Sequence, residues 1–236
     1  MARLRAVVLL SGGLDSAFNL WQAPRDYQVV KALTFDYGQR AATSEINAAQ
    51  KLCARLKIDH QVIALPWFSD FTRTSLVNLK EAIPVGSGVS IDELAQSQET
   101  AKAVWVPNRN GIFLNIAAAY AEGLGAEVVL TGFNAEEAVT FPDNSVQYLD
   151  ALNQSFYFST ANHVKVQSYC ANLSKTQIVT EARHIGLPLN MVWPCYFSGE
   201  EWCGQCESCQ RFARAVREAS IVSAQSENDL PMDGLL

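Results

Sequence analysis

The order of apolar and polar positions along the chain predicts short strands that alternate with helices. The candidate strands are apolar runs at residues 6–10, 29–35, 61–65, 127–131 and 164–168. Apolar side chains recur at helical spacing over residues 41–56, 110–122 and 174–184. This alternation favours an α/β fold with a doubly wound, Rossmann-like parallel sheet, in which ligands bind at the carboxyl ends of the strands.

Two stretches depart from this alternation. Residues 66–105 lack clear periodicity, and we expect a lid or an interface segment there. Residues 133–162 are interpreted as an insertion, with a turn at 142–144 followed by a helix. The polar stretch 223–236 is expected to be a flexible tail, which leaves residues 1–222 as a single domain.

Length and charge narrow the class of protein. A chain of 236 residues with 49% hydrophobic positions suits one α/β domain with a sizeable core. Its 24 acidic residues outnumber 18 basic ones, and the net charge of −6 disfavours a grip on a nucleic-acid backbone. We therefore expect a small-molecule substrate. With no signal-peptide pattern in the first ten residues and no apolar run long enough to span a bilayer, we expect a cytoplasmic protein.

The segment Ser11–Ser16, which reads SGGLDS, follows the first apolar run and has the composition of a phosphate-binding loop. Paired glycines allow a tight turn and a close approach to an anion, while serine hydroxyls and the next helix N-terminus supply donors. Asp15 suits a Mg²⁺ ion that accompanies phosphates. Neither GxxxxGK[ST] nor GxGxxG occurs here, which excludes the two commonest phosphate motifs. The alternative is a plain strand-to-helix turn with a serine cap.

This loop resembles the pyrophosphate loop (PP-loop) of the N-type ATP pyrophosphatases, whose fold is of the adenine nucleotide alpha hydrolase type. The resemblance implies that ATP is cleaved between its α and β phosphates, that a substrate oxygen is adenylated, and that a nucleophile displaces AMP. It also implies that one segment holds ATP and Mg²⁺. The residues concerned are Leu10, Ser11, Gly12, Gly13, Leu14, Asp15 and Ser16.

Four of the six cysteines lie close together near the C-terminus. They are Cys195, Cys203, Cys206 and Cys209. Thiolates at this spacing suit a tetrahedral, structural Zn²⁺ site with no open position, which we place at residues 195–209. An iron–sulfur cluster and free thiols are the alternatives. Cys53 and Cys170 are interpreted as ordinary buried thiols.

Further motifs make the resemblance more specific. They are TFDYGQR at residues 34–40, VPNRN at 106–110, LSKT at 173–176 and CGQCESC at 203–209. With the SGGLDS loop they resemble the 7-cyano-7-deazaguanine synthases of queuosine precursor biosynthesis, over about residues 6–211. The resemblance implies an ATP-dependent ligase that converts 7-carboxy-7-deazaguanine and ammonia to the nitrile, through an adenylated carboxylate and then an adenylated amide.

Roles for single residues follow from their positions in these motifs. Asp36 ends the second strand and either contacts the nucleotide or caps a helix; Arg40 either pairs with phosphate or lies on a helix face. Arg109 either stabilises charge on the α-phosphate or forms a surface salt bridge. Lys175 follows a serine cap, where a cation is unfavourable, so a phosphate contact is favoured. The predicted catalytic residues are Asp15, Ser16, Arg109 and Lys175.

One segment departs from the family pattern. Where the family has a sequence of the form SGYPDCR, this chain has Val139–Ser145, with Phe141 for the tyrosine and Asn144-Ser145 for the Cys-Arg pair. Phe141 is predicted to stack on a base and Asp143 to accept hydrogen bonds from a guanine-like edge. Asn108 replaces the glycine of the family's VPGRN.

This departure keeps a second hypothesis open: a related PP-loop ligase that modifies another acceptor, such as a protein or a tRNA base. The acidic charge argues against tRNA. A third hypothesis, a nucleotide-binding regulator without catalysis, is disfavoured because the loop is complete. We further expect a homodimer, formed through residues 66–105 and the C-terminal helix, with no direct nucleic-acid partner.

Overall fold

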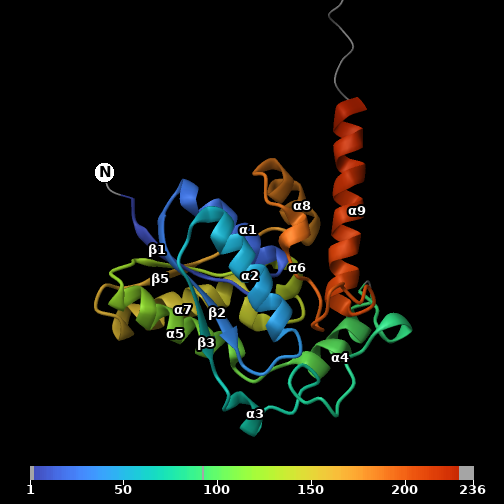
Figure 1. The fold of residues 1–236 in the computed structure, drawn as a ribbon, viewed down its shortest axis with the longest axis horizontal. Helices are drawn as coiled ribbons and strands as arrows, with labels where there is room; N and C mark the ends of the chain where they lie inside the picture. The colour runs from blue at the N-terminus through green and yellow to red at the C-terminus, as the bar shows by residue number, and fades with distance from the viewer. Residues whose placement is uncertain (1–2, 92, 229–236) are drawn as a thin grey trace, which may run out of the picture.

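The protein is described by a computed structural model that covers residues 3–91 and 93–228 (Figure 1). Its centre is a five-stranded parallel sheet in the order β3-β2-β1-β4-β5. The strands are β1 Arg5–Leu9, β2 Gln28–Asp36, β3 His60–Ala64, β4 Val128–Leu130 and β5 Lys165–Gln167. Each lies within one residue of its predicted bounds, and the doubly wound parallel sheet is confirmed.

Helices cover both faces of this sheet. They are α1 Leu14–Gln22, α2 Ala42–Leu56, α3 Phe68–Phe71, α4 Leu94–Val104, α5 Arg109–Gly123, α6 Ala135–Ala138, α7 Val146–Ser159, α8 Lys175–His184 and α9 Glu207–Asn228. Short 3₁₀ turns occur at η1 Ala23–Arg25, η2 Gly86–Gly88, η3 Pro142–Asn144 and η4 Leu189–Met191. In Figure 1, α1, α2 and α8 lie on one side of the sheet and α5 and α7 on the other. The three helices predicted from spacing are confirmed to within one residue.

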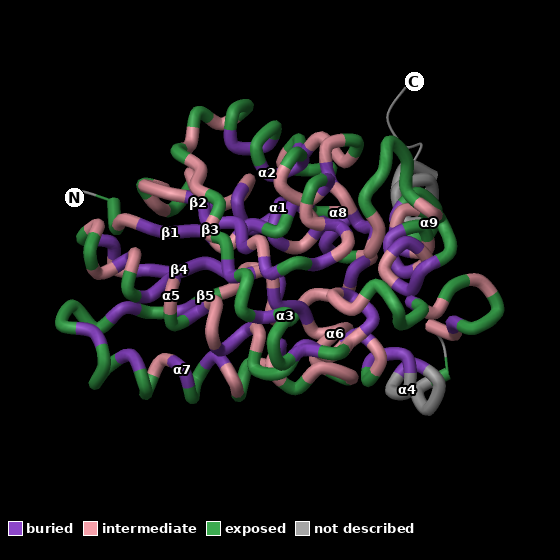
Figure 2. Tube along the Cα trace, turned by 60° about the horizontal axis from the view of Figure 1, so that its bottom comes forward, coloured by how far each residue is buried: buried purple, intermediate pink, exposed green. Residues whose placement is uncertain are grey.

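Alternation along β1 explains why its run is apolar throughout. Ala6 and Val8 belong to the core under α1, α2 and α8, whereas Val7 belongs to the core under α5 and α7. All three side chains are 0% exposed. In Figure 2, β1 and β4 are drawn as largely purple, buried stretches. A strand buried on both faces has no polar side to show, which is typical of parallel sheets.

The structure corrects the interpretation of one irregular stretch and reveals helices in the other. Residues 133–162 are not an insertion, because α7 within them is the crossover from β4 to β5. Their turn at 142–144 and the helix after it are confirmed as η3 and α7. The segment 66–105 contains α3 and α4, whose buried face includes Ser97 and Thr100. Polar residues on a buried face removed the apolar periodicity that would have predicted α4.

Helix α9 continues past residue 222, the end of the predicted domain. It runs to Asn228, so residues 223–228, where the tail was expected to begin, are helical. The rest of that expected tail, 229–236, lies outside the described residues. Within the described residues, no helix is both long enough and apolar enough to cross a membrane.

Candidate active site

The loop after β1 is shaped by a glycine that tolerates no side chain. Gly12 has φ 82°, and a Cβ there would lie 2.7 Å from the carbonyl oxygen of Glu45. The Ser11 and Ser16 hydroxyls lie 3.0 Å apart, and the backbone N–H of Ser11 donates to Ser16 Oγ. Gly13 precedes α1 and offers no side-chain cap, so the first N–H groups of the helix stay available to an anion.

The loop after β4 closes against the same turn. A Cβ on Gly132 would lie 2.6 Å from the backbone nitrogen of Ser16 and 2.9 Å from the carbonyl carbon of Asp15. Strands β1 and β4 are neighbours whose connections leave in opposite directions across the sheet. This is the switch point of a doubly wound sheet, where ligands bind.

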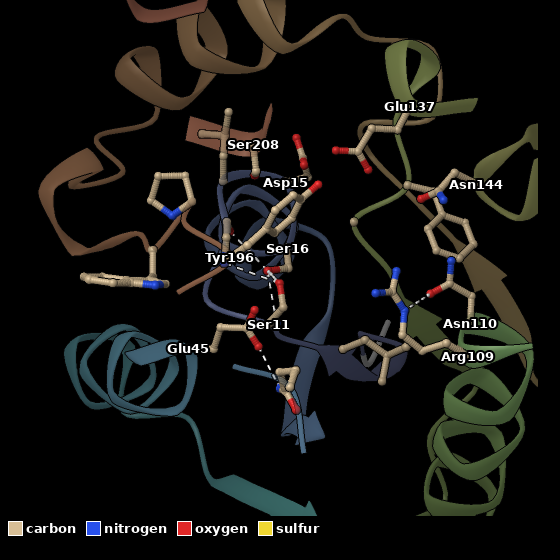
Figure 3. A pocket seen from close by; sticks show the side chains of 18 of the residues that line it. Ser11, Asp15, Ser16, Glu45, Arg109, Asn110, Glu137, Asn144, Tyr196 and Ser208 are labelled. Atoms are coloured by element: carbon tan, nitrogen blue, oxygen red, sulfur yellow. Dashed lines mark hydrogen bonds between the residues drawn. The ribbon is translucent and has the colours of Figure 1, made fainter. Parts of the chain in front are cut away.

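A cavity of about 260 Å³ opens at this switch point. Figure 3 shows polar side chains that converge on it from the β1 loop, α2, α5 and the segment after β4. A wall of residues 193–212 completes it, contributing Trp193, Pro194, Cys195, Tyr196, Glu207, Ser208, Arg211 and Phe212. Of the predicted residues, the lining includes Leu10, Ser11, Gly13, Leu14, Asp15, Ser16, Arg109, Phe141 and Lys175.

Lys175 and two carboxylates form the charged centre of the pocket. Its Nζ lies 2.7 Å from Asp15 Oδ2 and 2.7 Å from Glu137 Oε1, and its side chain is 7% exposed. Although burial opposes the charge, these carboxylates raise the pKa of Lys175 above its ordinary value. They also offset the unfavourable position of a cation at the first residue of α8, which Ser174 and Gln177 hold in a capping box.

Asp15 keeps one oxygen free for a ligand. Oδ1 is buried and has no hydrogen-bond partner among the described residues, while Oδ2 binds Lys175. Burial raises the pKa of Asp15 to about 6 against the opposing effect of Lys175. An unpaired buried carboxylate oxygen is costly, and a hard divalent cation is the partner that would satisfy it. The pocket therefore fits Mg²⁺ at Asp15, with Glu137 on the same side.

Arg109 enters the pocket opposite the loop. It begins α5, and its Nη1 donates to the Tyr37 hydroxyl at 3.3 Å. The preceding Asn108 has φ 50°, a left-handed conformation that asparagine tolerates in place of the family's glycine. A Cβ on Gly111 would lie 2.1 Å from Asn108 Oδ1, so the asparagine side chain occupies the space over that glycine.

Phe141 and Asp143 lie beside Arg109. The Phe141 ring lines the cavity and is nearly parallel to Trp105, with 6.2 Å between ring centroids. Asp143 lies just outside the lining, where its Oδ2 accepts a hydrogen bond of 2.8 Å from Asn110 Nδ2. Burial raises the pKa of Asp143, with Arg109 acting in the opposite direction.

The structure places two predicted phosphate or nucleotide contacts elsewhere. Asp36 Oδ1 accepts a hydrogen bond from the Gly38 N–H at 3.1 Å and is absent from the lining. The Arg40 guanidinium donates to the carbonyl oxygens of Asn78 and Glu81, and these hydrogen bonds hold part of the 66–105 segment in place. Neither residue lines the cavity, and both side chains form hydrogen bonds with backbone atoms.

Two pocket residues, Glu45 and Glu137, were not predicted from the sequence. Glu45 lies in the first turn of α2, and Glu137 belongs to an acidic pair directly after the β4 loop. Acidic residues in a first helical turn are common for dipole reasons alone, so their spacing carries no functional signal. Burial raises the pKa of Glu45 to about 7.

The four predicted metal ligands do come together. The Sγ atoms of Cys195, Cys203, Cys206 and Cys209 all lie within 4.8 Å of one another. Backbone N–H groups of Phe197 and Cys203 donate to Cys195 Sγ, and those of Gln205 and Cys206 donate to Cys203 Sγ. Donors aimed at sulfur stabilise thiolates, so the residues present fit a metal with a four-sulfur shell.

The cysteine segment is tied to the phosphate loop through backbone contacts. The Trp193 N–H donates to the Gly12 carbonyl oxygen at 2.8 Å. On its other side, the Gly86 N–H donates to the Gln205 carbonyl oxygen at 3.0 Å, and Val85 forms a β-bridge with Cys206. The segment thus connects residues 85–86 to the nucleotide side of the sheet.

A buried ion network continues from this segment toward Lys175. Arg211 on α9 lies 2.8 Å from Glu136 Oε1 and 2.8 Å from Glu207 Oε1, and it donates to Ser97 Oγ on α4. Glu136 also pairs with Arg214 and accepts a hydrogen bond from the Lys175 backbone N–H at 3.3 Å. Helices α4, α6, α8 and α9 are therefore linked at the edge of the pocket.

Three features define the PP-loop class of ATP-using α/β enzymes. They are the parallel sheet, the SGGLDS turn at its switch point and the charged centre formed by Asp15, Lys175 and Glu137. The fold is similar to the solved structure of a 4-thiouridine synthetase–RNA complex with bound ATP, at TM-score 0.50 and 16% identity over 96% of this chain and 54% of that one. The chain belongs to the family described as queuosine biosynthesis protein QueC, whose model matches residues 5–220.

Curated relatives agree with this family. A 7-cyano-7-deazaguanine synthase of Bdellovibrio bacteriovorus is 55% identical over 92% of this chain and 94% of the relative. One of Methanosarcina barkeri is 47% identical over 92% of this chain and 96% of the relative.

Proposed function

We propose that this chain is an ATP-dependent ligase that converts 7-carboxy-7-deazaguanine and ammonia to 7-cyano-7-deazaguanine, releasing AMP and pyrophosphate. The relatives named 7-cyano-7-deazaguanine synthase align with 92% of this chain. The observation that carries the proposal is one pocket that unites a phosphate loop, Arg109 and the Asp15–Lys175–Glu137 centre.

The first step is adenylation. A carboxylate oxygen of the substrate forms a bond to the α-phosphorus of ATP, and the bond from that phosphorus to pyrophosphate breaks. Ser11, Ser16 and the N–H groups that open α1 stabilise the departing pyrophosphate. Arg109, on the opposite wall, stabilises charge on the α-phosphate.

Lys175 is held ready for this step by ion pairs. Its carboxylate partners, Asp15 and Glu137, would hold Mg²⁺ once ATP is bound, and the ion would neutralise charge on the phosphates. Support comes from the unpaired Oδ1 of Asp15. The Lys175 ammonium then faces the phosphates, while Asp15 and Glu137 stabilise its positive charge.

Zn²⁺ is proposed for the four-cysteine site, with a structural role. Four thiolates leave no open position for a substrate, and the segment's backbone holds the phosphate loop in place. A zinc site of thiolates needs reduced cysteines, which fits our proposal that the protein acts in the cytoplasm.

The deazaguanine ring is proposed to bind near Phe141 and Asp143. Phe141 offers an aromatic face at the cavity wall, and Asp143 is an acceptor for the amino and ring N–H groups of a guanine-like edge. Because burial raises the pKa of Asp143, donors from the substrate would restore its charged form.

A second candidate function is adenylation of another acceptor, a protein or a tRNA base. Asn144 and Ser145 favour it, since they stand where the family has a Cys-Arg pair. The free small molecule is preferred because the net charge is −6 and no basic run offers a backbone grip.

We also propose a homodimer without a direct nucleic-acid partner. Light scattering after gel filtration would test the oligomeric state.

The experiment that tests the function is mass spectrometry of a reaction that contains purified protein, ATP, Mg²⁺, ammonium and 7-carboxy-7-deazaguanine. The nitrile, AMP and pyrophosphate are expected from the wild type and absent with Asp15→Ala. AMP release without nitrile, in the presence of a different acceptor, would move the assignment to the second candidate.

A further inference from the structure

Glu45 is a pocket carboxylate for which the adenylation chemistry has no role. Figure 3 shows it on α2, directed into the same space as Ser11 and Arg109. Its Oε2 accepts a hydrogen bond of 2.8 Å from Gln39 Nε2. Gln39 is 5% exposed and fixed in turn, because the same Nε2 donates to the Phe35 carbonyl oxygen at 2.9 Å. The position of the carboxylate is therefore set by the sheet.

The surroundings leave this carboxylate free to exchange a proton. The charged groups that face it are Arg109 on α5 and Asp36 on β2. No described cation lies within ion-pair distance of Glu45, and its other oxygen accepts no hydrogen bond from a described residue. Burial raises its pKa to about 7, with Gln39 and Arg109 acting in the opposite direction, so both protonation states are accessible near neutral pH.

The proposed reaction must remove protons from nitrogen after each adenylation. Attack by ammonia leaves a positively charged nitrogen on the adduct, and formation of the nitrile removes the last N–H. Other groups in the pocket are poor acceptors. Arg109 and Lys175 are cations, and Asp15 and Glu137 already share the Lys175 ammonium. Glu207, the other carboxylate of the lining, is paired with Arg211, so Glu45 remains for this task.

We propose that Glu45 is the catalytic base of the two steps that follow adenylation, an inference that rests on the proposed function. In the first, the nitrogen of ammonia bonds to the acyl carbon, one of its protons passes to Glu45, and the carbon–oxygen bond to AMP breaks with the electron pair on the phosphate oxygen. Glu45 then releases its proton to solvent. In the second step, the adenylated amide loses one N–H proton to solvent and becomes a neutral imidate; Glu45 takes the remaining imidate N–H proton, the nitrogen forms the nitrile, and AMP leaves in the same way.

The variant Glu45→Gln tests this role while keeping the size of the side chain and an acceptor for Gln39. ATP–pyrophosphate exchange with 7-carboxy-7-deazaguanine, measured without ammonia, is expected to stay at the wild-type rate. Amide formation with ammonium near neutral pH is expected to fall about 10²–10⁴-fold, the usual loss for a missing general base. Glu181→Gln, an exposed glutamate on α8, is the matched control and keeps both rates.

A comparison of nucleophiles protects the test against partial unfolding of the variant. Hydroxylamine gives a less basic nitrogen than ammonia and depends less on a strong acceptor. The Glu45→Gln loss is therefore expected to be smaller with hydroxylamine than with ammonia. Because both rates come from one preparation, their ratio does not depend on the folded fraction.

The outcomes separate the two proposals. A wild type that makes no nitrile overturns the proposed function. A wild type that makes nitrile, with Glu45→Gln equally active or equally impaired with both nucleophiles, overturns the role of Glu45 alone. Loss of ATP–pyrophosphate exchange in the variant would also overturn it, because Glu45 would then act in adenylation.

Discussion

At the scale of single residues, the site depends on positions where no side chain fits. Gly132→Ala would place a Cβ against the backbone of Asp15 and Ser16, neither of which can yield without moving the phosphate loop. We expect this variant to lose most ATP–pyrophosphate exchange and to be less stable. Gly123→Ala is the control, because a Cβ at the end of α5 meets nothing within 4 Å. The unfolding free energy of Gly123→Ala should exceed that of the wild type by about 0.5–1 kcal/mol, and thermal and urea unfolding measure this difference.

The Glu45 carboxyl should also leave a signature in stability. Its folded pKa of about 7 lies above the ordinary value of 4.5, so the folded protein binds this proton more tightly than the unfolded chain. The resulting stabilisation is complete below about pH 4.5 and is lost as the pH rises through 7. The unfolding free energy of Glu45→Gln, relative to that of the wild type, should therefore rise by on the order of 2 kcal/mol from pH 5 to pH 8.

Urea unfolding of both proteins at these two pH values measures that gain. An unchanged difference between them would mean that Glu45 titrates with an ordinary pKa. Comparing the two proteins cancels the contribution of Asp15, whose pKa is also raised by burial.

The sequence identified residues whose role is set by local backbone, and not those set by distant partners. The turn Ser11–Ser16 follows from its own glycines, and Lys175 follows from its serine cap. For Arg40, the sequence left open both a contact with phosphate and a position on a helix face. The carbonyl oxygens that bind it, from residues 78 and 81, become adjacent only on folding. The partners of Glu45 and Glu137, which are Gln39 and Lys175, are likewise brought next to them only by folding.

At the scale of elements, the cysteine segment should be a metal-dependent unit. Cys203→Ala is expected to reduce bound zinc, measured by elemental mass spectrometry, from one ion per chain toward none. The melting temperature should fall by roughly 10 °C, since the metal's binding energy stabilises the fold. Cys53→Ala, which lies on α2 in the core, should retain the metal. Equal zinc content in both variants would contradict the four-sulfur site.

The ion network on α9 should contribute more than a surface pair. Arg211→Met would leave Glu207 buried without its cation and Glu136 with Arg214 alone, and we expect a loss of about 3–5 kcal/mol in unfolding free energy. ATP–pyrophosphate exchange should also fall, because Glu136 holds the backbone of Lys175. Arg217→Met, an exposed position on the same helix, should change stability by less than about 0.5 kcal/mol. Similar effects at both positions would argue against the network.

Elements with a conventional apolar pattern were predicted to within a residue, and the others were not. Helix α4 presents Ser97 and Thr100 to a buried ionic cluster, so no apolar stripe revealed it. The segment 133–162 resembled an insertion because α6 and η3 delay the crossover helix. Strand order was also beyond reach, since parallel pairing follows from βα alternation while the order depends on where each crossover packs.

At the scale of the whole molecule, the acidic charge favours a free substrate over a polymer. We expect added tRNA to be neither modified nor inhibitory, because a chain of net charge −6 gains little from releasing counterions at a nucleic-acid backbone. Nucleoside mass spectrometry of the tRNA, together with nitrile formation in its presence, checks this. A new modified nucleoside that depends on ATP would favour the second candidate function.

Residues 193–212 close the pocket although they are the last part of the site to be synthesised. A nascent chain that ends before them carries the glycine loop and Lys175, but it lacks the Trp193 contact to Gly12 and the Arg211 contact to Glu136. Its half-built pocket is open to water, which would hydrolyse any acyl adenylate. We therefore expect competence for the reaction to arrive late in translation, once the cysteine segment has left the ribosome and folded against the phosphate loop.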